Sequence, residues 1–346
     1  MSVKPLNQKR NNECLIDFLR FSLPNAKLPD VVSILGLELS EFSAESLGSP
    51  FPNYDRKTCF ANIEVHFSNK HEKALVNLSG QACRQYEEYM SRVEGWHWQA
   101  FIDSIIDSKA KVSRIDLALD IFDDSSPSVQ KIQDYIKRGQ LSAKSHKFVE
   151  INSGRISDGV LTGFTVYIGA TPQILRIYDK KQERRDNTDE IVMVEKWTRW
   201  ELELTDQKAM QVAQKIAYGR PLSGLIKGIL AAHYSFKTQP KGKKEIHNKS
   251  RLPNMQWWDK FIGSVEKVPL RVVREKMTLS KKKKWIEKST SKSLAMVYQT
   301  LESAYDKEIA NAYFAELLET GTKKLTEVDR SMIEQRINEL LNGDEY

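Results

Sequence analysis

Nine ionisable residues alternate with apolar residues in three short segments of the sequence. They are Arg114, Asp116 and Asp120 in the first segment, Arg176, Tyr178 and Lys180 in the second, and Arg199, Glu201 and Glu203 in the third. Carboxylate oxygens are the ligands that Mg²⁺ and Mn²⁺ prefer, so the four acids predict a site for one of these ions. Such an ion would polarise a phosphodiester and stabilise the negative charge of its transition state.

Tyr178 is the candidate nucleophile of such a site. Its phenol has an ordinary pKa of about 10, so a neighbouring cation, a metal ion or a base carboxylate must activate it. Arg176 and Lys180 on either side of it, and Lys181 and Arg184 beyond, could hold a phosphate or the leaving strand. Which of the acids bind metal and which act as the base stays open.

Side chains alternate across a β-strand, so residues two apart lie on one face. The three segments therefore predict strands over 112–122, 174–179 and 198–204, each with one apolar and one charged face. A solvated face of an antiparallel sheet gives the same alternation. Such a face usually mixes lysine with threonine, serine and glutamine, whereas these three hold almost only ionisable residues. The combination favours a functional site.

The pattern along the whole chain predicts an α+β fold. We expect a largely antiparallel sheet with flanking helices, of the nuclease or relaxase type, followed by a helical C-terminal region. Residues 1–235 form the expected catalytic domain, 236–293 a basic segment with short helices that contacts DNA, and 294–346 the helical region. Apolar residues at helical spacing predict one continuous helix over 294–317. Ser126 is the expected N-cap of an earlier helix.

Basic charge is concentrated in one part of the chain. The net charge is +7, but residues 237–292 hold 17 basic and 5 acidic residues, which leaves −5 for the remainder. Lysine-rich segments suit phosphate backbones, because each neutralised phosphate releases condensed counterions; a protein partner or solvent is the alternative. Trp257, Trp258 and Trp285 in this segment could stack on bases or cover a core. The candidate DNA contacts are Arg114, Lys181 and Arg184 near the tyrosine, and Lys241, Lys243, Lys244, Lys281, Lys282, Lys283 and Lys284 in the basic segment.

Several common classes of protein are excluded by what the sequence lacks. Three cysteines without Cys-x-x-Cys spacing indicate neither a disulfide framework nor a zinc finger. There is no P-loop motif, so ATP hydrolysis of that type is not expected, and no His-hydrophobe-His pair of the HUH nucleases. No signal-peptide pattern and no apolar run of membrane-spanning length occur, so we expect a cytoplasmic protein with no membrane partner.

The segments that carry the charged strands resemble a known family. SRIDLALDIFDD (113–124), YIGATPQILRIYDKKQERRDN (167–187) and RWELEL (199–204) are similar to the Rep_trans family of replication initiation factors. NLSGQACRQYEEY (77–89) is similar to its strand-turn-helix, and TLSKKKKWIEKSTSKSLAMV (278–297) resembles it more weakly. The Arg-Ile-Tyr strand with its basic tail is the most specific of these motifs.

The resemblance implies that the protein initiates rolling-circle replication by nicking and rejoining one strand of a double-strand origin, usually in an extruded hairpin. Tyr178 would form a 5′-phosphotyrosine link and leave a free 3′-hydroxyl, with no need for ATP. The family's acids map onto Asp116, Asp120, Glu201 and Glu203 with Mg²⁺ or Mn²⁺, and its basic tail onto Lys180, Lys181 and Arg184. The resemblance also implies a homodimer, a superfamily 1 helicase as partner, and a bacterial host in which a plasmid, phage or integrative element encodes the protein.

Three other interpretations are weighed against a replication initiator. A relaxase of a conjugative element would use the same chemistry. A non-catalytic DNA-binding regulator of replication could have the same fold, although the intact Tyr178 and its four acids argue against it. An RNA-binding protein would rest on the basic segment alone.

Overall fold

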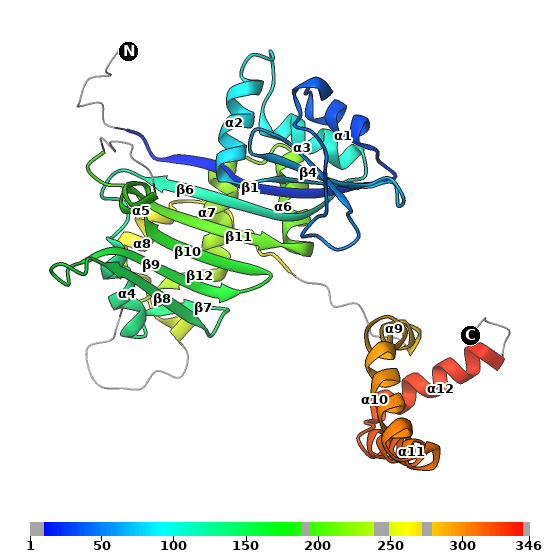
Figure 1. The fold of residues 1–346 in the computed structure, drawn as a ribbon. Helices are drawn as coiled ribbons and strands as arrows, with labels where there is room; N and C mark the ends of the chain where they lie inside the picture. The colour runs from blue at the N-terminus through cyan, green and yellow to red at the C-terminus, as the bar shows by residue number, and fades with distance from the viewer. Residues whose placement is uncertain (1–9, 188–193, 239–248, 272–278, 342–346) are drawn as a thin grey trace. The chain divides into compact units, whose positions relative to one another are not determined.

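The computed structural model describes residues 10–187, 194–238, 249–271 and 279–341 (Figure 1). The chain divides into two compact units, Met1–Val272 and Val273–Tyr346, and each is described by itself. No helix among the described residues is long and apolar enough to cross a membrane.

The first unit is built on a ten-stranded sheet in which every neighbouring pair is antiparallel. In spatial order the strands are β2 (Ser46–Leu47), β3 (Arg56–Phe60), β4 (Ile63–Ser68), β5 (Lys73–Leu78), β1 (Glu13–Pro24), β6 (Lys111–Ile121), β11 (Thr198–Thr205), β10 (Gln173–Asp179), β9 (Leu161–Ala170) and β8 (Phe148–Gly154). A second sheet pairs β12 (Tyr234–Phe236) with β7 (Leu141–Ala143). The predicted α+β fold with a largely antiparallel sheet is confirmed.

Eight α-helices accompany these strands in the described part of the first unit. They are α1 (Leu28–Leu35), α2 (Gly80–Met90), α3 (Trp98–Asp107), α4 (Val129–Lys137), α5 (Lys180–Asn187), α6 (Asp206–Ala217), α7 (Leu222–His233) and α8 (Gln256–Ile262). Single 3₁₀ turns are η1 (Leu39–Glu41) and η2 (Lys249–Arg251). Helices α6 and α7 lie behind the central strands in Figure 1 and pack on the apolar face of β6. The opposite, charged face of these strands is therefore left for a site.

Ser128 caps the start of α4, where Ser126 was expected. The Ser128 hydroxyl accepts a hydrogen bond from the Lys131 N–H at 3.4 Å. The Ser126 hydroxyl instead accepts one from the indole N–H of Trp200 at 3.0 Å. The prediction of Ser126 as the N-cap was wrong, because Ser126 is used to satisfy a buried indole.

An aromatic cluster ties part of the basic segment to the first unit. Trp200 is fully buried, and its ring centroid lies 5.9 Å from that of Trp258 and 4.9 Å from that of Phe261. Trp257 stacks on Tyr135 with centroids 6.1 Å apart. The unit boundary thus falls after Val272 and differs from the expected one after residue 235, since residues 255–262 complete this core. Of the tryptophans considered for base stacking, Trp257 and Trp258 cover the core.

The second unit is helical. It contains α9 (Leu279–Trp285), a π-helical turn η3 (Ile286–Thr290), α10 (Ser291–Ala304), α11 (Lys307–Lys323) and α12 (Glu327–Leu341). The continuous helix predicted over 294–317 is wrong, because the chain breaks between Ala304 and Lys307. Asp306 caps α11 by accepting a hydrogen bond from the Ile309 N–H at 2.7 Å.

Candidate active site

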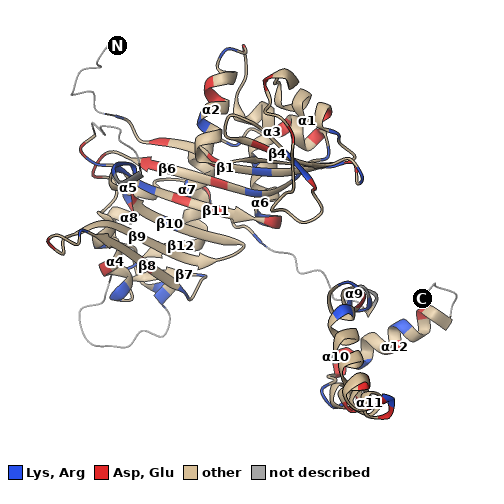
Figure 2. Cartoon of the chain, viewed as in Figure 1, with Lys and Arg blue, Asp and Glu red and all other residues tan. Residues whose placement is uncertain are grey.

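The three predicted charged strands are neighbours at the centre of the sheet. Strand β11 lies between β6 and β10, and all three are antiparallel. The register places Arg199 between Asp120 and Tyr178 in one row across the sheet, and Glu201 opposite Arg176 in the next. Because opposite residues share a face, the charged faces merge into one surface. Figure 2 shows the acidic and basic positions along these strands.

Tyr178 and Glu201 form the hydrogen bond at the middle of this surface. The Tyr178 hydroxyl donates to Glu201 Oε2 at 2.8 Å, and Arg176 Nη2 donates to Glu201 Oε1 at 2.5 Å. Burial raises the pKa of the Glu201 carboxyl to about 7, although the charge of Arg176 opposes the rise. Burial and then the charge of Glu201 raise the pKa of the Tyr178 phenol well above its ordinary value. In this arrangement the proton rests on the tyrosine, with an acceptor in direct contact.

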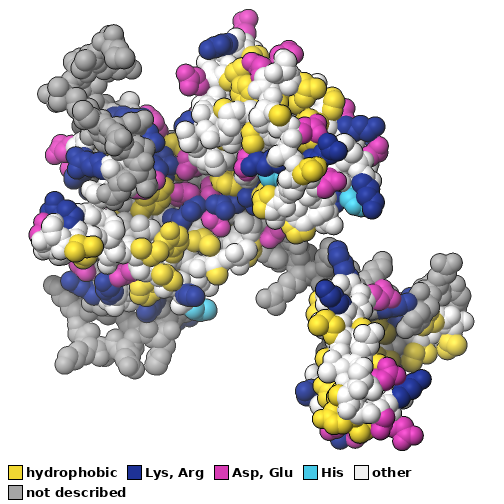
Figure 3. Space-filling model, viewed as in Figure 1, with side chains coloured by type: hydrophobic (Ala, Val, Ile, Leu, Met, Phe, Trp, Pro, Cys, Tyr) yellow, Lys and Arg dark blue, Asp and Glu magenta, His cyan; other side chains and the backbone are white. Residues whose placement is uncertain are grey.

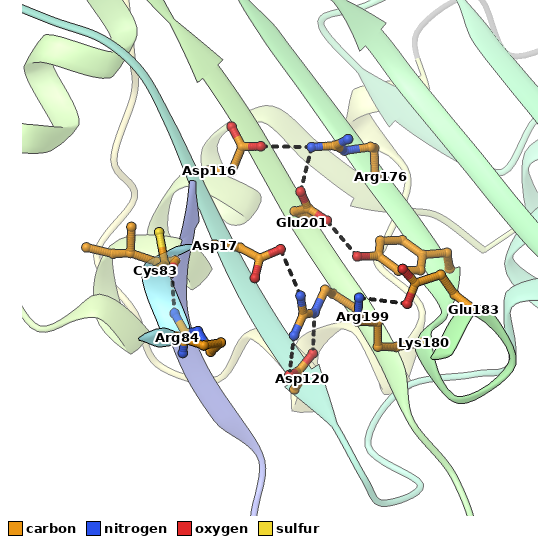
Figure 4. Close-up of polar contacts among 12 residues, drawn as sticks. Asp17, Cys83, Arg84, Asp116, Asp120, Arg176, Lys180, Glu183, Arg199 and Glu201 are labelled. Carbon is orange, nitrogen blue, oxygen red and sulfur yellow. Dashed lines mark hydrogen bonds and ion pairs between the residues drawn. The ribbon is translucent and has the colours of Figure 1, made fainter. Parts of the chain in front are cut away.

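Three carboxylates converge on one nitrogen atom of Arg176, and Figure 4 shows two of them, Asp116 and Glu201. Besides Glu201, Arg176 Nη2 lies 2.9 Å from Asp116 Oδ2 and 3.4 Å from Glu203 Oε2. Arg114 Nη2 also binds Asp116 at 2.6 Å and Glu203 at 2.9 Å. Asp116 is only 1% exposed. The charged surface is thus an internally paired cluster and not a solvated sheet face.

The fit of this cluster to a divalent ion depends on Arg176. Within the described ranges, no group of three or more His, Cys, Asp or Glu residues is arranged to hold a metal ion. The oxygens of Asp116, Glu201 and Glu203 nevertheless surround a single cationic nitrogen, and they are the donors that Mg²⁺ or Mn²⁺ prefers. The donor set therefore fits such an ion if the guanidinium withdraws. The metal site stays a prediction.

Asp120 stands apart from the other three predicted metal ligands. Its two oxygens accept hydrogen bonds from Nε and Nη2 of Arg199, each at 2.7 Å. Asp17 accepts a further bond from Arg199 Nη1 at 2.8 Å. Burial lowers the pKa of Arg199, but the hydrogen bonds to Asp120 and the charge of Asp17 outweigh it and raise the pKa. Asp120 and Asp17 together fix a buried cation opposite Tyr178.

A β-bulge brings in two site residues that the sequence did not reveal. Ile16 pairs with Leu117 and Phe18 with Asp116, so Asp17 is an extra residue in β1. Asp17 and Phe18 consequently both line the cleft. Strict alternation would send one of them into the core, and a bulge leaves no simple mark in the sequence.

The cluster forms the floor of a cleft with a volume of about 1090 Å³. Figure 3 shows acidic and basic side chains gathered in a hollow over the central strands. Helix α2 contributes Gln81 and Arg84 to its wall, and α5 contributes Glu183 and Arg184. Such a concave, charged site suits a polar substrate that can displace some of the internal ion pairs.

Comparison with known proteins agrees with this architecture. Residues 110–313, more than half of the chain, match the family model described as Replication initiation factor. The chain belongs to the replication initiation factor family. Residues 13–104 match the model described as Rolling Circle replication initiation protein N-terminal domain. The resemblance read from the three charged strands is thereby confirmed.

Two individual proteins illustrate the relationship. The chain is 23% identical over 322 residues to the Bacillus subtilis (strain 168) protein named "Putative DNA relaxase NicK", with 91% of this chain and 89% of that protein covered. The solved structure of a rolling-circle replication initiator protein from Geobacillus stearothermophilus has a TM-score of 0.63 and 24% identity, over 74% of this chain and 97% of that chain. The second likeness shows that the fold is shared.

Of the basic residues predicted to contact DNA near Tyr178, some line the cleft and one does not. Lys180 lies 5.6 Å from the centroid of the Tyr178 ring and pairs with Glu183 at 2.7 Å. Arg114, Lys180 and Arg184 line the cleft. The Lys181 amine instead donates to the backbone carbonyl of Glu195 at 3.0 Å.

The lysines of the basic segment that were predicted to contact DNA lie outside the described residues or in the second unit. Lys241, Lys243 and Lys244 lie outside the described residues, as do the side chains of Lys281 and Lys284. In the second unit, Lys282 pairs with Asp329 at 2.8 Å, and Lys283 lies 3.8 Å from Glu287. A DNA-binding role for these lysines stays a prediction.

Proposed function

We propose that this protein nicks and rejoins one strand of its cognate DNA through a covalent bond to Tyr178. The observation that carries the proposal is the hydrogen bond from the Tyr178 hydroxyl to Glu201, at the floor of a cleft lined with arginines. The Tyr178 oxygen attacks the scissile phosphorus, its proton passes to Glu201, and the P–O3′ bond breaks. The 3′ oxygen leaves and takes a proton from water, and the 5′ phosphate stays on the tyrosine. Attack by a 3′-hydroxyl reverses the sequence and rejoins the strand.

Glu201 is suited to act as the base of this reaction. A carboxyl with a pKa of about 7 is close to the working pH, which is where a general acid–base group transfers protons best. Arg176 holds Oε1 of Glu201, so that Oε2 is the oxygen presented to the phenol. Arg199 lies opposite Tyr178 in the register and would stabilise the developing phenolate.

The arginines of the cluster are the groups that would meet the phosphate. Arg176 Nε is buried and has no hydrogen-bond partner in the described structure. A bound phosphate oxygen would satisfy this donor and compete with the carboxylates for Arg176. Asp116 and Glu203 would then be free to hold Mg²⁺ or Mn²⁺, an ion that would supply Lewis-acid stabilisation of the phosphodiester, while Glu201 keeps its contact with Tyr178.

Aromatic and basic side chains extend from the cluster across β1. The Arg114 guanidinium lies 4.2 Å from the centroid of the Phe18 ring, and that of Arg20 lies 5.1 Å from Phe18 and 4.7 Å from Phe51. Alternation of rings and cations is typical of surfaces that bind single-stranded nucleic acid. It supports a path for the unpaired strand from Tyr178 toward Phe51.

The biological role that follows is initiation of rolling-circle replication at a double-strand origin, with a homodimer and a superfamily 1 helicase as further parts of the proposal. A specific observation favours a second role. The relative named as a relaxase matches 91% of this chain and 89% of its own length, so the two chains share nearly their whole extent. Transfer of a conjugative element would use the same chemistry at a different site in the DNA.

The test uses supercoiled DNA that carries the cognate nick site, with Mn²⁺. The wild type is expected to give nicked circles and a covalent adduct, and Tyr178→Phe neither. Tyr167→Phe is the matched control, since Tyr167 is a partly buried tyrosine opposite Arg176 on the adjacent strand. Trypsin should leave the DNA on the peptide 177–180, because it cleaves after Arg176 and after Lys180. Adduct formation by Tyr178→Phe would overturn the assignment of the nucleophile.

A further inference from the structure

A second cavity in the first unit shares no lining residue with the Tyr178 cleft. Its volume is about 560 Å³, and it is lined by residues of β7, the end of α7, β12, α8 and the segments next to them. A cavity of this size is within the range that holds a small ligand such as a nucleotide. The proposed strand cleavage makes no use of it.

Three lysines line this cavity, and none of them forms an ion pair with a carboxylate in the described part of the chain. Lys237 is only 9% exposed, and its amine donates to the neutral amide oxygen of Asn254 at 2.8 Å. No carboxylate of the described residues lies within ion-pair distance of Lys144, Lys237 or Lys267. Asp259, the one acid in the lining, is bound by the Asn254 amide at 2.7 Å. The cavity therefore carries a clear excess of positive charge.

The neighbouring cations repel one another. Burial and then the charge of Lys144 lower the pKa of Lys208, whose amine donates to Gln173 at 2.9 Å. Burial, Lys144 and Lys208 together lower the pKa of His233 to about 4. Burial also lowers the pKa of Lys237; the charge of Asp259 opposes this shift, and the charge of Lys267 adds to it. Like charges brought together with partial loss of water destabilise the fold unless an anion offsets them.

The local fold explains why these lysines face one cavity. Strands β7 and β12 pair over three residues, and the Lys237 N–H donates to the Gln140 carbonyl at one end of the ladder. At the other end the Lys144 N–H donates to the His233 carbonyl. The two lysines thus enter the cavity from opposite ends of the same short sheet, and Lys267 lines it beyond α8. An elongated anion with more than one charge would meet all three.

We propose that this cavity binds a phosphate-bearing ligand, held by Lys144, Lys237 and Lys267. Its lining also includes the hydroxyl-bearing residues Ser142 and Ser235, which suit phosphate oxygens. Two sources offer this chemistry, namely a free phosphorylated small molecule and consecutive backbone phosphates of DNA. Both ligands would use the same three lysines, so the experiment must distinguish between them.

The experiment uses the full chain and two probes, inorganic pyrophosphate in a calorimeter and a labelled DNA oligonucleotide in an anisotropy titration. Lys144→Glu and Lys267→Glu are combined, because both side chains are exposed and their replacement should not disturb the core. Lys260→Glu is the matched control, an exposed lysine of α8 that does not line the cavity. Thermal unfolding of each variant verifies that the fold is kept.

If the ligand is a small molecule, the double variant should bind pyrophosphate about tenfold or more weakly, and its affinity for DNA should equal that of the control. If the ligand is DNA, the double variant should bind the oligonucleotide more weakly and with a flatter salt dependence of its affinity. Pyrophosphate should then compete with the oligonucleotide for the wild type. Either result supports the site. If neither probe separates the double variant from Lys260→Glu, the proposal is overturned.

Discussion

Tyr178 and Glu201 share a hydrogen bond of 2.8 Å between two side chains that are both largely buried. Burial penalises the charged form of each residue, so neither ionises readily on its own. A proton that moves from the phenol to the carboxylate leaves one negative charge in the pair, beside Arg176 and Arg199. The pair can therefore transfer the proton within the cleft without exchange with solvent.

The pH dependence of nicking should follow Glu201. The carboxyl must be deprotonated to accept the proton, and its raised pKa of about 7 means that the acceptor is lost as the pH falls below that value. We expect the nicking rate to rise with pH up to about 7 and then level off. Glu201→Gln should lower the rate by about 10²–10⁴-fold and abolish this rise. Single-turnover rates across pH 5.5–9 measure it, and an unchanged pH profile in Glu201→Gln would exclude the base role.

Loss of Arg199 should destabilise the fold more than loss of a surface cation. Arg199→Ala leaves Asp120, which is 2% exposed, buried without its partner, a change that costs about 3–5 kcal/mol. Lys196→Ala removes an exposed pair with Asp124 and should change the free energy of unfolding by about 0–1 kcal/mol. Urea unfolding of both variants gives the comparison. Equal effects would show that Arg199 is not a structural support of the site.

Phe18 should contribute to binding of the unpaired strand. Phe18→Ala removes the ring that lies against Arg114 and Arg20, and stacking on such a ring is worth about 1–3 kcal/mol per base. Affinity for an oligonucleotide should fall by about fivefold or more, measured in a Tyr178→Phe background so that no cleavage occurs. Phe148→Ala on the edge strand β8, an exposed ring outside the cleft, serves as the control. Equal affinities of the two variants would place the strand elsewhere.

Metal dependence should separate Asp120 from the acids around Arg176. Asp116→Asn and Glu203→Gln should each raise the Mn²⁺ concentration needed for half-maximal nicking, since both carboxylates contact Arg176 Nη2. Asp120→Asn should leave this concentration unchanged and lower stability, because its oxygens are bound to Arg199. The measurement is the nicking rate of each variant as a function of the Mn²⁺ concentration. A shift for Asp120→Asn alone would contradict the ligand set.

The central strands were predictable because their chemistry follows the two-residue period of a strand. Arg114 and Asp116, or Glu201 and Glu203, are found on one face by counting alone. The bulge at Asp17 escapes such counting, because one inserted residue changes the face without changing the composition. The contact of Trp200 with Trp258 was also hidden, since the two residues are far apart in sequence. The helix break at Asp306 escaped because Tyr305 and Ile309 continue the apolar spacing across it.

The bulge in β1 adds Asp17 to the site without changing the face on which Phe18 lies. Deletion of a single residue at position 17 would restore a regular ladder between β1 and β6, which should favour the stability of the sheet. The same deletion would remove the Asp17 carboxylate that binds Arg199, while Phe18 would stay opposite Asp116 on the cleft face. Selection for a more stable sheet and selection for DNA processing therefore act in opposite directions on this one residue. A variant that lacks Asp17 is expected to fold well, to keep the Phe18 ring in the cleft, and to lose part of the support of Arg199 beside Tyr178.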